Sequence, residues 1–248
     1  MPRDADAPTV VIVHGAWVGA TAWREVIVLL QVKGLRVIAA QIPLNSLADD
    51  VDTVTRAIKL QADHVVLVGH GYGGTVITQA GNHSDVVALV YVAAFAPDAG
   101  ESTADAQKDF GLPPSVLRLR VDAGGFLYLA PEALLEFFAH DLPAVESQVL
   151  AAAQKPIRAS ALLDRVSAAA WRTKPSWYAV SDGDRMIAPS LQYDFANRID
   201  ASVFILSTGH APFLSKPKET ADVILTAAQS LRCRGSAGEA IATPSDRE

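Results

Sequence analysis

Three short segments of the chain hold residue types that could do acid–base chemistry on a small molecule. They are His14-Gly-Ala-Trp17, Gly69-His-Gly-Tyr-Gly-Gly74, and Asp182-Gly-Asp184 together with Gly209-His210. A histidine held by a carboxylate can take a proton from a reacting group, and backbone amides beside glycines can stabilise an oxyanion. Each segment follows an apolar run, and open parallel sheets bind their ligands just past the carboxyl ends of strands. The segments therefore predict a small-molecule site at one edge of a sheet.

The elements that must position these segments alternate between short apolar runs and longer amphipathic stretches. Strands are expected at residues 9–13, 36–40, 65–68 and 86–94, and helices at 20–32, 47–60 and 72–80. In the second helix Leu47, Val51, Val54 and Ile58 recur at helical spacing, and Ser46 can cap its start. This alternation predicts an α/β fold, a mostly parallel sheet with helices on both faces.

The alternation stops between residues 97 and 175, which are richer in proline and irregular pieces. A hairpin of residues 117–121 and 126–129 and short helices at 131–139, 142–154 and 160–169 are expected there. Strands at 176–180 and 202–206 and helices at 189–198 and 218–231 follow. We therefore expect one core from residues 1–96 and 176–231, an inserted lid at 97–175, and a loose C-terminal tail at 232–248.

Composition limits the partners of the chain. Half of its 248 residues are apolar, and 21 Lys and Arg against 27 Asp and Glu give a net charge of −6. Without a basic cluster we expect no nucleic-acid partner. The single cysteine, Cys233, and the scattered histidines predict no disulfide framework and no metal site. A polar start and the lack of a long apolar run predict a cytoplasmic protein without a membrane partner.

The turn at Gly69–Gly73 has the Gly-x-x-x-Gly frame of a nucleophile elbow, where a strand turns sharply into a helix. With the other segments in the same order, the sequence resembles the α/β-hydrolase superfamily from about residue 9 to residue 231. The resemblance is closest to the compact bacterial esterase-like group related to plant methylesterases and hydroxynitrile lyases. It implies an α/β-hydrolase fold and an enzyme that needs no cofactor.

The resemblance also implies roles for individual residues. His210 takes the place of the triad histidine, and Asp184 the place of its acid, with Asp182 and Asp98 as the alternatives. The oxyanion-hole donors are the backbone amides of Ala16 and Tyr72.

Position 71 departs from the family pattern, which has the nucleophilic serine where this chain has Gly71. Glycine cannot attack a carbonyl, so the route through an acyl-enzyme is lost. Three explanations stay open: a serine-to-glycine change that inactivates an ester hydrolase, a cofactor-free lyase, isomerase or cyclase with His210 and Asp184 as general base, or a non-catalytic small-molecule binding protein. Cyanohydrin cleavage is disfavoured, because those relatives have a lysine where this chain has Ala211.

Aromatic residues indicate the substrate class. Trp17 and the lid residues Phe126, Tyr128, Phe137 and Phe138 are the candidate lining, which favours small apolar or aromatic esters and lactones over sugars or phosphates. A Rossmann nucleotide-binding protein is the alternative from a different class, because the glycines of the elbow approach G-x-G-x-x-G. The apolar strand that follows lacks the acidic residue such a site requires.

Overall fold

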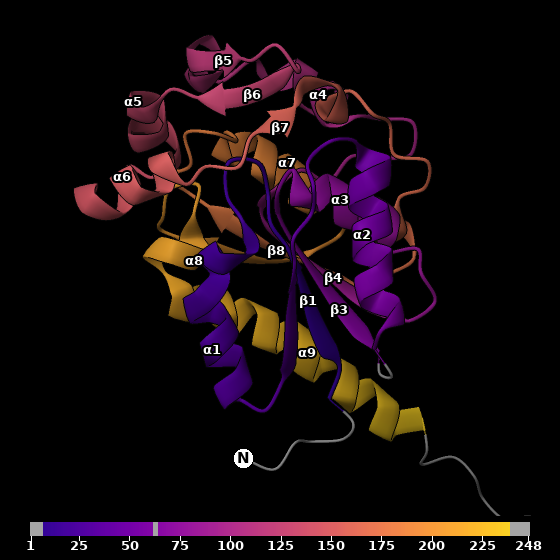
Figure 1. Ribbon diagram of the computed structural model, residues 1–248. Helices are drawn as coiled ribbons and strands as arrows, with labels where there is room; N and C mark the ends of the chain where they lie inside the picture. The colour runs from indigo at the N-terminus through magenta and orange to yellow at the C-terminus, as the bar shows by residue number, and fades with distance from the viewer. Residues whose placement is uncertain (1–6, 62–63, 239–248) are drawn as a thin grey trace, which may run out of the picture.

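The computed structural model describes residues 7–61 and 64–238, and its main feature is a six-stranded, wholly parallel sheet (Figure 1). The strand order is β2-β1-β3-β4-β8-β9. The bounds are β1 (Thr9–Val13), β2 (Arg36–Ala40), β3 (Val65–Gly71), β4 (Val86–Ala94), β8 (Ser176–Ser181) and β9 (Ser202–Leu206). The predicted α/β fold with a mostly parallel sheet is confirmed.

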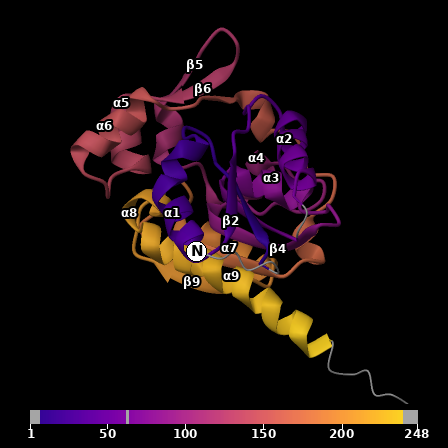
Figure 2. The same ribbon diagram turned by 60° about the horizontal axis from the view of Figure 1, so that its bottom comes forward.

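Helices cover both faces of this sheet. Helices α1 (Arg24–Val32) and α9 (Pro217–Gly238) lie together on one face, and α2 (Leu47–Lys59), α3 (Gly73–Ala80) and α7 (Pro189–Arg198) lie on the other (Figures 1 and 2). Alternate residues of each strand point to opposite faces. Val10 and Ile12 of β1 accordingly join the core under α1 and α9, whereas Val11 and Val13 join the core under α2 and α3.

The lid segment, residues 97–175, connects β4 to β8. It holds a small antiparallel sheet whose strand order is β5-β6-β7. Its elements are α4 (Thr103–Gln107), β5 (Leu119–Val121), β6 (Phe126–Leu129), α5 (Pro131–Ala133), α6 (Ala144–Ala152) and β7 (Ile157–Arg158). Figure 1 shows them above the carboxyl ends of the main strands, so the lid segment lies over the loops that follow these strands.

Two helix predictions differ from the structure. The expected helix at 160–169 is only a short 3₁₀ helix, η5 (Ala159–Leu162), because the chain beyond it pairs with the start of the lid segment instead: Val166 donates its amide to Glu101 and accepts one from Gly100. The helix expected to end at residue 231 continues to Gly238 as α9, since extending an existing helix costs little. The tail predicted at 232–248 is thus partly helical, and its part from 239 onward lies outside the described residues.

Glycines allow the loop that follows β1 to lie close to the turn that follows β3. A Cβ atom on Gly73 would lie 2.5 Å from the Val13 carbonyl oxygen, and one on Gly69 would lie 2.6 Å from the Gly73 carbonyl oxygen. Both distances are too short for a real side chain, so only glycine allows strand and helix to approach this closely. Among the helices that the structure describes, none has the length and apolar character needed to cross a membrane.

Candidate active site

His210 and Asp184 form a buried hydrogen-bonded pair at the carboxyl end of the sheet. Asp184 follows β8, and His210 lies between β9 and the short helix α8 (Pro212–Ser215). The distance from His210 Nδ1 to Asp184 Oδ2 is 2.8 Å, and the two side chains are 5% and 0% exposed. This pairing leaves His210 Nε2 as the nitrogen that faces the cavity, where it can accept a proton.

Three further donors fix the Asp184 carboxylate. Its Oδ1 accepts the backbone amides of Met186 (2.7 Å) and Ile187 (3.0 Å), and its Oδ2 accepts Gln192 Nε2 at 2.8 Å. The carboxylate therefore cannot turn away from His210 without breaking several bonds at once.

The two alternative acids lie elsewhere. Asp182 is exposed and accepts the Ser207 hydroxyl at 3.1 Å. Asp98 forms an ion pair with Arg172, which lowers the pKa of the Asp98 carboxyl. Of the three aspartates, the structure brings only Asp184 to His210.

Gly71 ends β3 in a left-handed backbone conformation, with φ of +52°. A Cβ atom built on it would lie 3.5 Å from His210 Nε2 and 3.8 Å from the Gly15 Cα atom, which are ordinary van der Waals distances. The site thus has room for a small side chain at position 71, directed at the histidine nitrogen that can accept a proton.

This backbone conformation gives the first testable prediction. Gly71→Ala should lower the free energy of unfolding by about 1–2 kcal/mol, because a left-handed φ strains any L side chain even where space is available. Urea denaturation measures the change. Gly19→Ala is the matched control: its Cβ would also have its nearest neighbour at 3.5 Å, but its φ is −116°. Equal stabilities of the two variants would contradict the prediction.

Ala16 and Tyr72 line the same cavity as Gly71 and His210. Within the described part of the chain, neither backbone amide donates to a protein acceptor. The neighbouring Trp17 amide does: it donates to the Lys155 carbonyl at 2.8 Å, and Trp17 itself has a φ of +62°. The lid segment thus holds the loop after β1 by the residue next to Ala16.

His14 and His70 are buried beside the pair and support its loops. His70 Nε2 donates to the His210 carbonyl at 2.9 Å. Burial lowers the pKa of His14 to about 4 and holds the pKa of His70 well below its ordinary value. Both rings are therefore neutral near pH 7, which suits packing and hydrogen bonding rather than proton transfer.

Sequence reasoning missed Asp50, a fully buried aspartate on α2. Its Oδ2 accepts the Tyr72 hydroxyl at 3.0 Å, and its Oδ1 accepts the Leu44 amide at 2.7 Å. The signal was available, because Asp50 stands three residues after Leu47 and four before Val54, within the apolar stripe. The bond ties the residue after Gly71 to a neighbouring helix.

Asp50 also gives a pH-dependent prediction. Burial raises the pKa of its carboxyl from 3.8 to about 6. A raised pKa means that the folded protein binds the proton more tightly, so this contribution to stability is present at low pH and is lost as the pH rises through 6. Relative to Asp50→Asn, the native protein should gain about 1 kcal/mol when the pH falls from 8 to 5.

Urea denaturation of both proteins at the two pH values measures this difference. The buried histidines have lowered pKa values and destabilise the fold as the pH falls, but they are common to both proteins and cancel. A stability difference that is the same at pH 5 and pH 8 would contradict the assignment.

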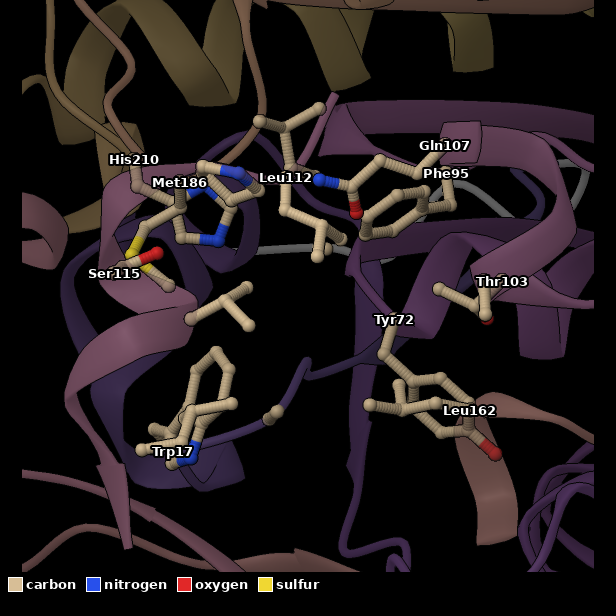
Figure 3. Close-up of a pocket in the computed structure, with 17 residues that line it drawn as sticks. Trp17, Tyr72, Phe95, Thr103, Gln107, Leu112, Ser115, Leu162, Met186 and His210 are labelled. Atoms are coloured by element: carbon tan, nitrogen blue, oxygen red, sulfur yellow. The ribbon is translucent and has the colours of Figure 1, made fainter. Parts of the chain in front are cut away.

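The site opens into a cavity of about 240 Å³ between the sheet and the lid segment (Figure 3). Its lining is mostly apolar and contains no Asp, Glu, Lys or Arg side chain. The lining residues are Ala16, Trp17, Gly71, Tyr72, Phe95, Thr103, Ala104, Gln107, Leu112, Pro113, Ser115, Val116, Leu119, Leu162, Met186, Ile187 and His210.

The structure places the five aromatic candidates differently from the expected lining, and only Trp17 faces this cavity. Phe126 packs against the Arg158 guanidinium, and Tyr128 pairs across the hairpin. Phe137 lines a second cavity of about 460 Å³, and Phe138 packs its ring edge-on behind His210 at 4.9 Å. The aromatic residues mostly stabilise the lid segment and its junction with the core, whereas smaller residues between 103 and 119 line the cavity.

Comparison with known proteins identifies the family. The family model described as the alpha/beta hydrolase family matches residues 10–223. A probable hydrolase from a Phoma species is 26% identical over 88% of this chain and 96% of its own length. A carbendazim-hydrolysing esterase from a Nocardioides species is 34% identical over 43% of this chain and 49% of its own. The crystal structure of a methylesterase from Arabidopsis, 18% identical, covers 90% of this chain and 99% of its own with a TM-score of 0.77. The chain therefore belongs to the alpha/beta hydrolase family.

Proposed function

We propose that this protein binds small apolar or aromatic esters and lactones in a hydrolase site that lacks only the nucleophile's side chain. The observation that carries the proposal is the placement of Gly71, whose missing Cβ would lie 3.5 Å from His210 Nε2. A carboxylate holds that histidine from behind, and Ala16 and Tyr72, whose backbone amides donate to no protein acceptor among the described residues, line the same cavity. A serine at position 71 would complete the arrangement that acyl transfer uses.

Without a hydroxyl at position 71 the site can still bind an ester but cannot hydrolyse it through an acyl-enzyme. With a serine, His210 would take the hydroxyl proton while the oxygen attacks the ester carbonyl, and the amides of Ala16 and Tyr72 would stabilise the oxyanion. With Gly71 no acyl-enzyme can form, although the cavity and the amides stay in place. In another Ser–His–Asp enzyme, loss of the serine alone lowers turnover about 10⁶-fold. The native chain should therefore bind esters and release them intact.

Co-crystallisation with methyl phenylacetate, combined with calorimetric titration, tests this function. We expect an intact ester above Gly71 whose carbonyl oxygen lies about 3 Å from the amides of Ala16 and Tyr72. Val116→Trp should fill the cavity and abolish binding, whereas Val121→Trp, at a position 64% exposed and outside the lining, should leave binding unchanged. Failure of a panel of small esters and lactones to bind would refute the proposal.

The intact pair supports a second function, general-base catalysis without a cofactor. Because position 71 has no side chain, none stands there between His210 Nε2 and a bound ligand. Nε2 could take a proton from a carbon next to a carbonyl, the electron pair would move to the oxygen held by the two amides, and reprotonation would complete an isomerisation. Exchange of that carbon-bound hydrogen in D₂O, followed by NMR and abolished in His210→Ala, would support this function. Binding without exchange would leave only the binding role.

A further inference from the structure

Ser115 is a buried hydroxyl in the otherwise apolar part of the lid segment that faces the cavity. It lies in a 3₁₀ helix, η3 (Pro114–Arg118), and is 1% exposed. Its neighbours in the lining are Leu112, Pro113 and Val116. In Figure 3 Ser115 lies with Met186 on the side of the cavity where His210 stands, across from Thr103 and Leu162.

The Ser115 hydroxyl differs from the other hydroxyls of the lining in its partners. The Tyr72 hydroxyl donates to Asp50, and the Thr103 hydroxyl bonds to the Thr75 hydroxyl at 2.8 Å. Among the described residues, the Ser115 hydroxyl has no hydrogen-bond partner in the protein. Burying a hydroxyl without a partner costs free energy, and a ligand group that bonds to it recovers that cost.

The remaining surroundings restrict what such a ligand can be. The lining has no Asp, Glu, Lys or Arg side chain, so an ionised ligand group would lose its hydration without compensation. A serine hydroxyl both donates and accepts, which suits a hydroxyl, an oxo group or an amide equally. The amides of Ala16 and Tyr72 come from the core, whereas Ser115 comes from the lid segment, so a carbonyl and a second polar group on one ligand can be bound from two directions.

We infer that Ser115 is a specificity-determining residue and that the cavity takes neutral carbonyl compounds with a second hydrogen-bonding group, such as hydroxy- or oxo-esters and lactones. The inference rests on the proposed function, because it concerns the ligand of the same cavity. It adds that a plain alkyl or aryl ester leaves one buried hydroxyl unpaired and binds less tightly.

Calorimetric titration of the native protein with matched ester pairs tests this inference. The pairs are methyl phenylacetate with methyl mandelate, and methyl 3-phenylpropanoate with methyl 3-hydroxy-3-phenylpropanoate, which place the hydroxyl at two distances from the ester. In at least one pair the hydroxy ester should bind about fivefold to tenfold more tightly than its plain partner. Ser115→Ala should remove this preference, so that the two esters of each pair bind with affinities within about twofold of each other.

Ser176→Ala is the control, because it removes a buried serine hydroxyl that bonds to the Lys174 carbonyl at the other end of β8. It should keep the preference. Should Ser115→Ala fail to fold, a crystal structure of the native protein with the hydroxy ester decides: the inference requires the ligand hydroxyl within about 2.5–3.0 Å of Ser115 Oγ.

The outcomes separate the inference from the function on which it rests. Equal affinities within both pairs, or a preference that survives in Ser115→Ala, would overturn the role of Ser115 while ester binding stands. Failure of all four esters to bind would overturn the proposed ester function and the role of Ser115 with it.

Discussion

Gly71→Ser is expected to hydrolyse p-nitrophenyl acetate and butyrate on the order of 10⁴ to 10⁶ times faster than the native chain. The reason is geometric: the Cβ at this position would lie 3.5 Å from His210 Nε2, so the serine oxygen can reach a nitrogen that Asp184 already orients. The expected gain reflects the loss seen when the serine is removed from another enzyme of this type. Release of p-nitrophenolate, followed at 400 nm, measures it.

The new serine should also cost stability, by about 1–2 kcal/mol, because it adopts the same left-handed backbone as Gly71→Ala. Gly71→Ala serves as the control for the hydrolysis itself: it introduces the Cβ without the hydroxyl and should stay as slow as the native chain. A folded Gly71→Ser protein that is inactive on a broad panel of esters would contradict the proposal that position 71 is a nucleophile position.

The second large effect concerns the hydrogen-bonded pair of His210 and Asp184. In the Gly71→Ser background, His210→Ala should lower the hydrolysis rate by about 10⁴-fold or more, and Asp184→Asn by about 10⁴-fold. Without the histidine no base removes the serine proton, and without the carboxylate the ring loses the partner that fixes its tautomer. Asp182→Asn is the matched control, because this aspartate lies two residues from Asp184 but bonds to Ser207 on the surface. An unchanged rate in Asp184→Asn would exclude Asp184 as the acid.

The helices and strands could be predicted because the spacing of apolar residues along the chain follows which side of each element is buried. The alternating faces of β1 and the spacing of Leu47, Val54 and Ile58 on α2 correspond to the two cores of the fold. Ser46 accepts the Asp49 amide at 3.1 Å, as its position before the stripe indicated. These features depend on neighbours within a few residues, which is the range over which a single sequence carries information.

The cavity lining could not be predicted in the same way, because it depends on contacts between distant segments. The aromatic content of the sequence predicted that Phe126, Tyr128 and Phe138 line the cavity. Their rings instead pack within the lid segment or against His210. Ser115 gave no signal of its own. Its proposed role depends on the lack of a hydrogen-bond partner among the described residues, and this can be seen only once the surrounding side chains are placed.

Trp17 is bound to the lid segment at two points, and this restricts how a ligand can reach the site. Its indole Nε1 donates to the Leu127 carbonyl at 3.0 Å, and its amide donates to the Lys155 carbonyl at 2.8 Å. Displacing the β6 and β7 half of the lid segment would pull on Trp17 and so on the adjacent Ala16 amide. Residues 103–116 make no hydrogen bond to Trp17 within the described part of the chain, so displacing them would not pull on that amide. Under the proposed function, a ligand that enters there would reach the Ala16 amide without any change in the loop that holds it, so admission to the cavity would not require the site to be assembled.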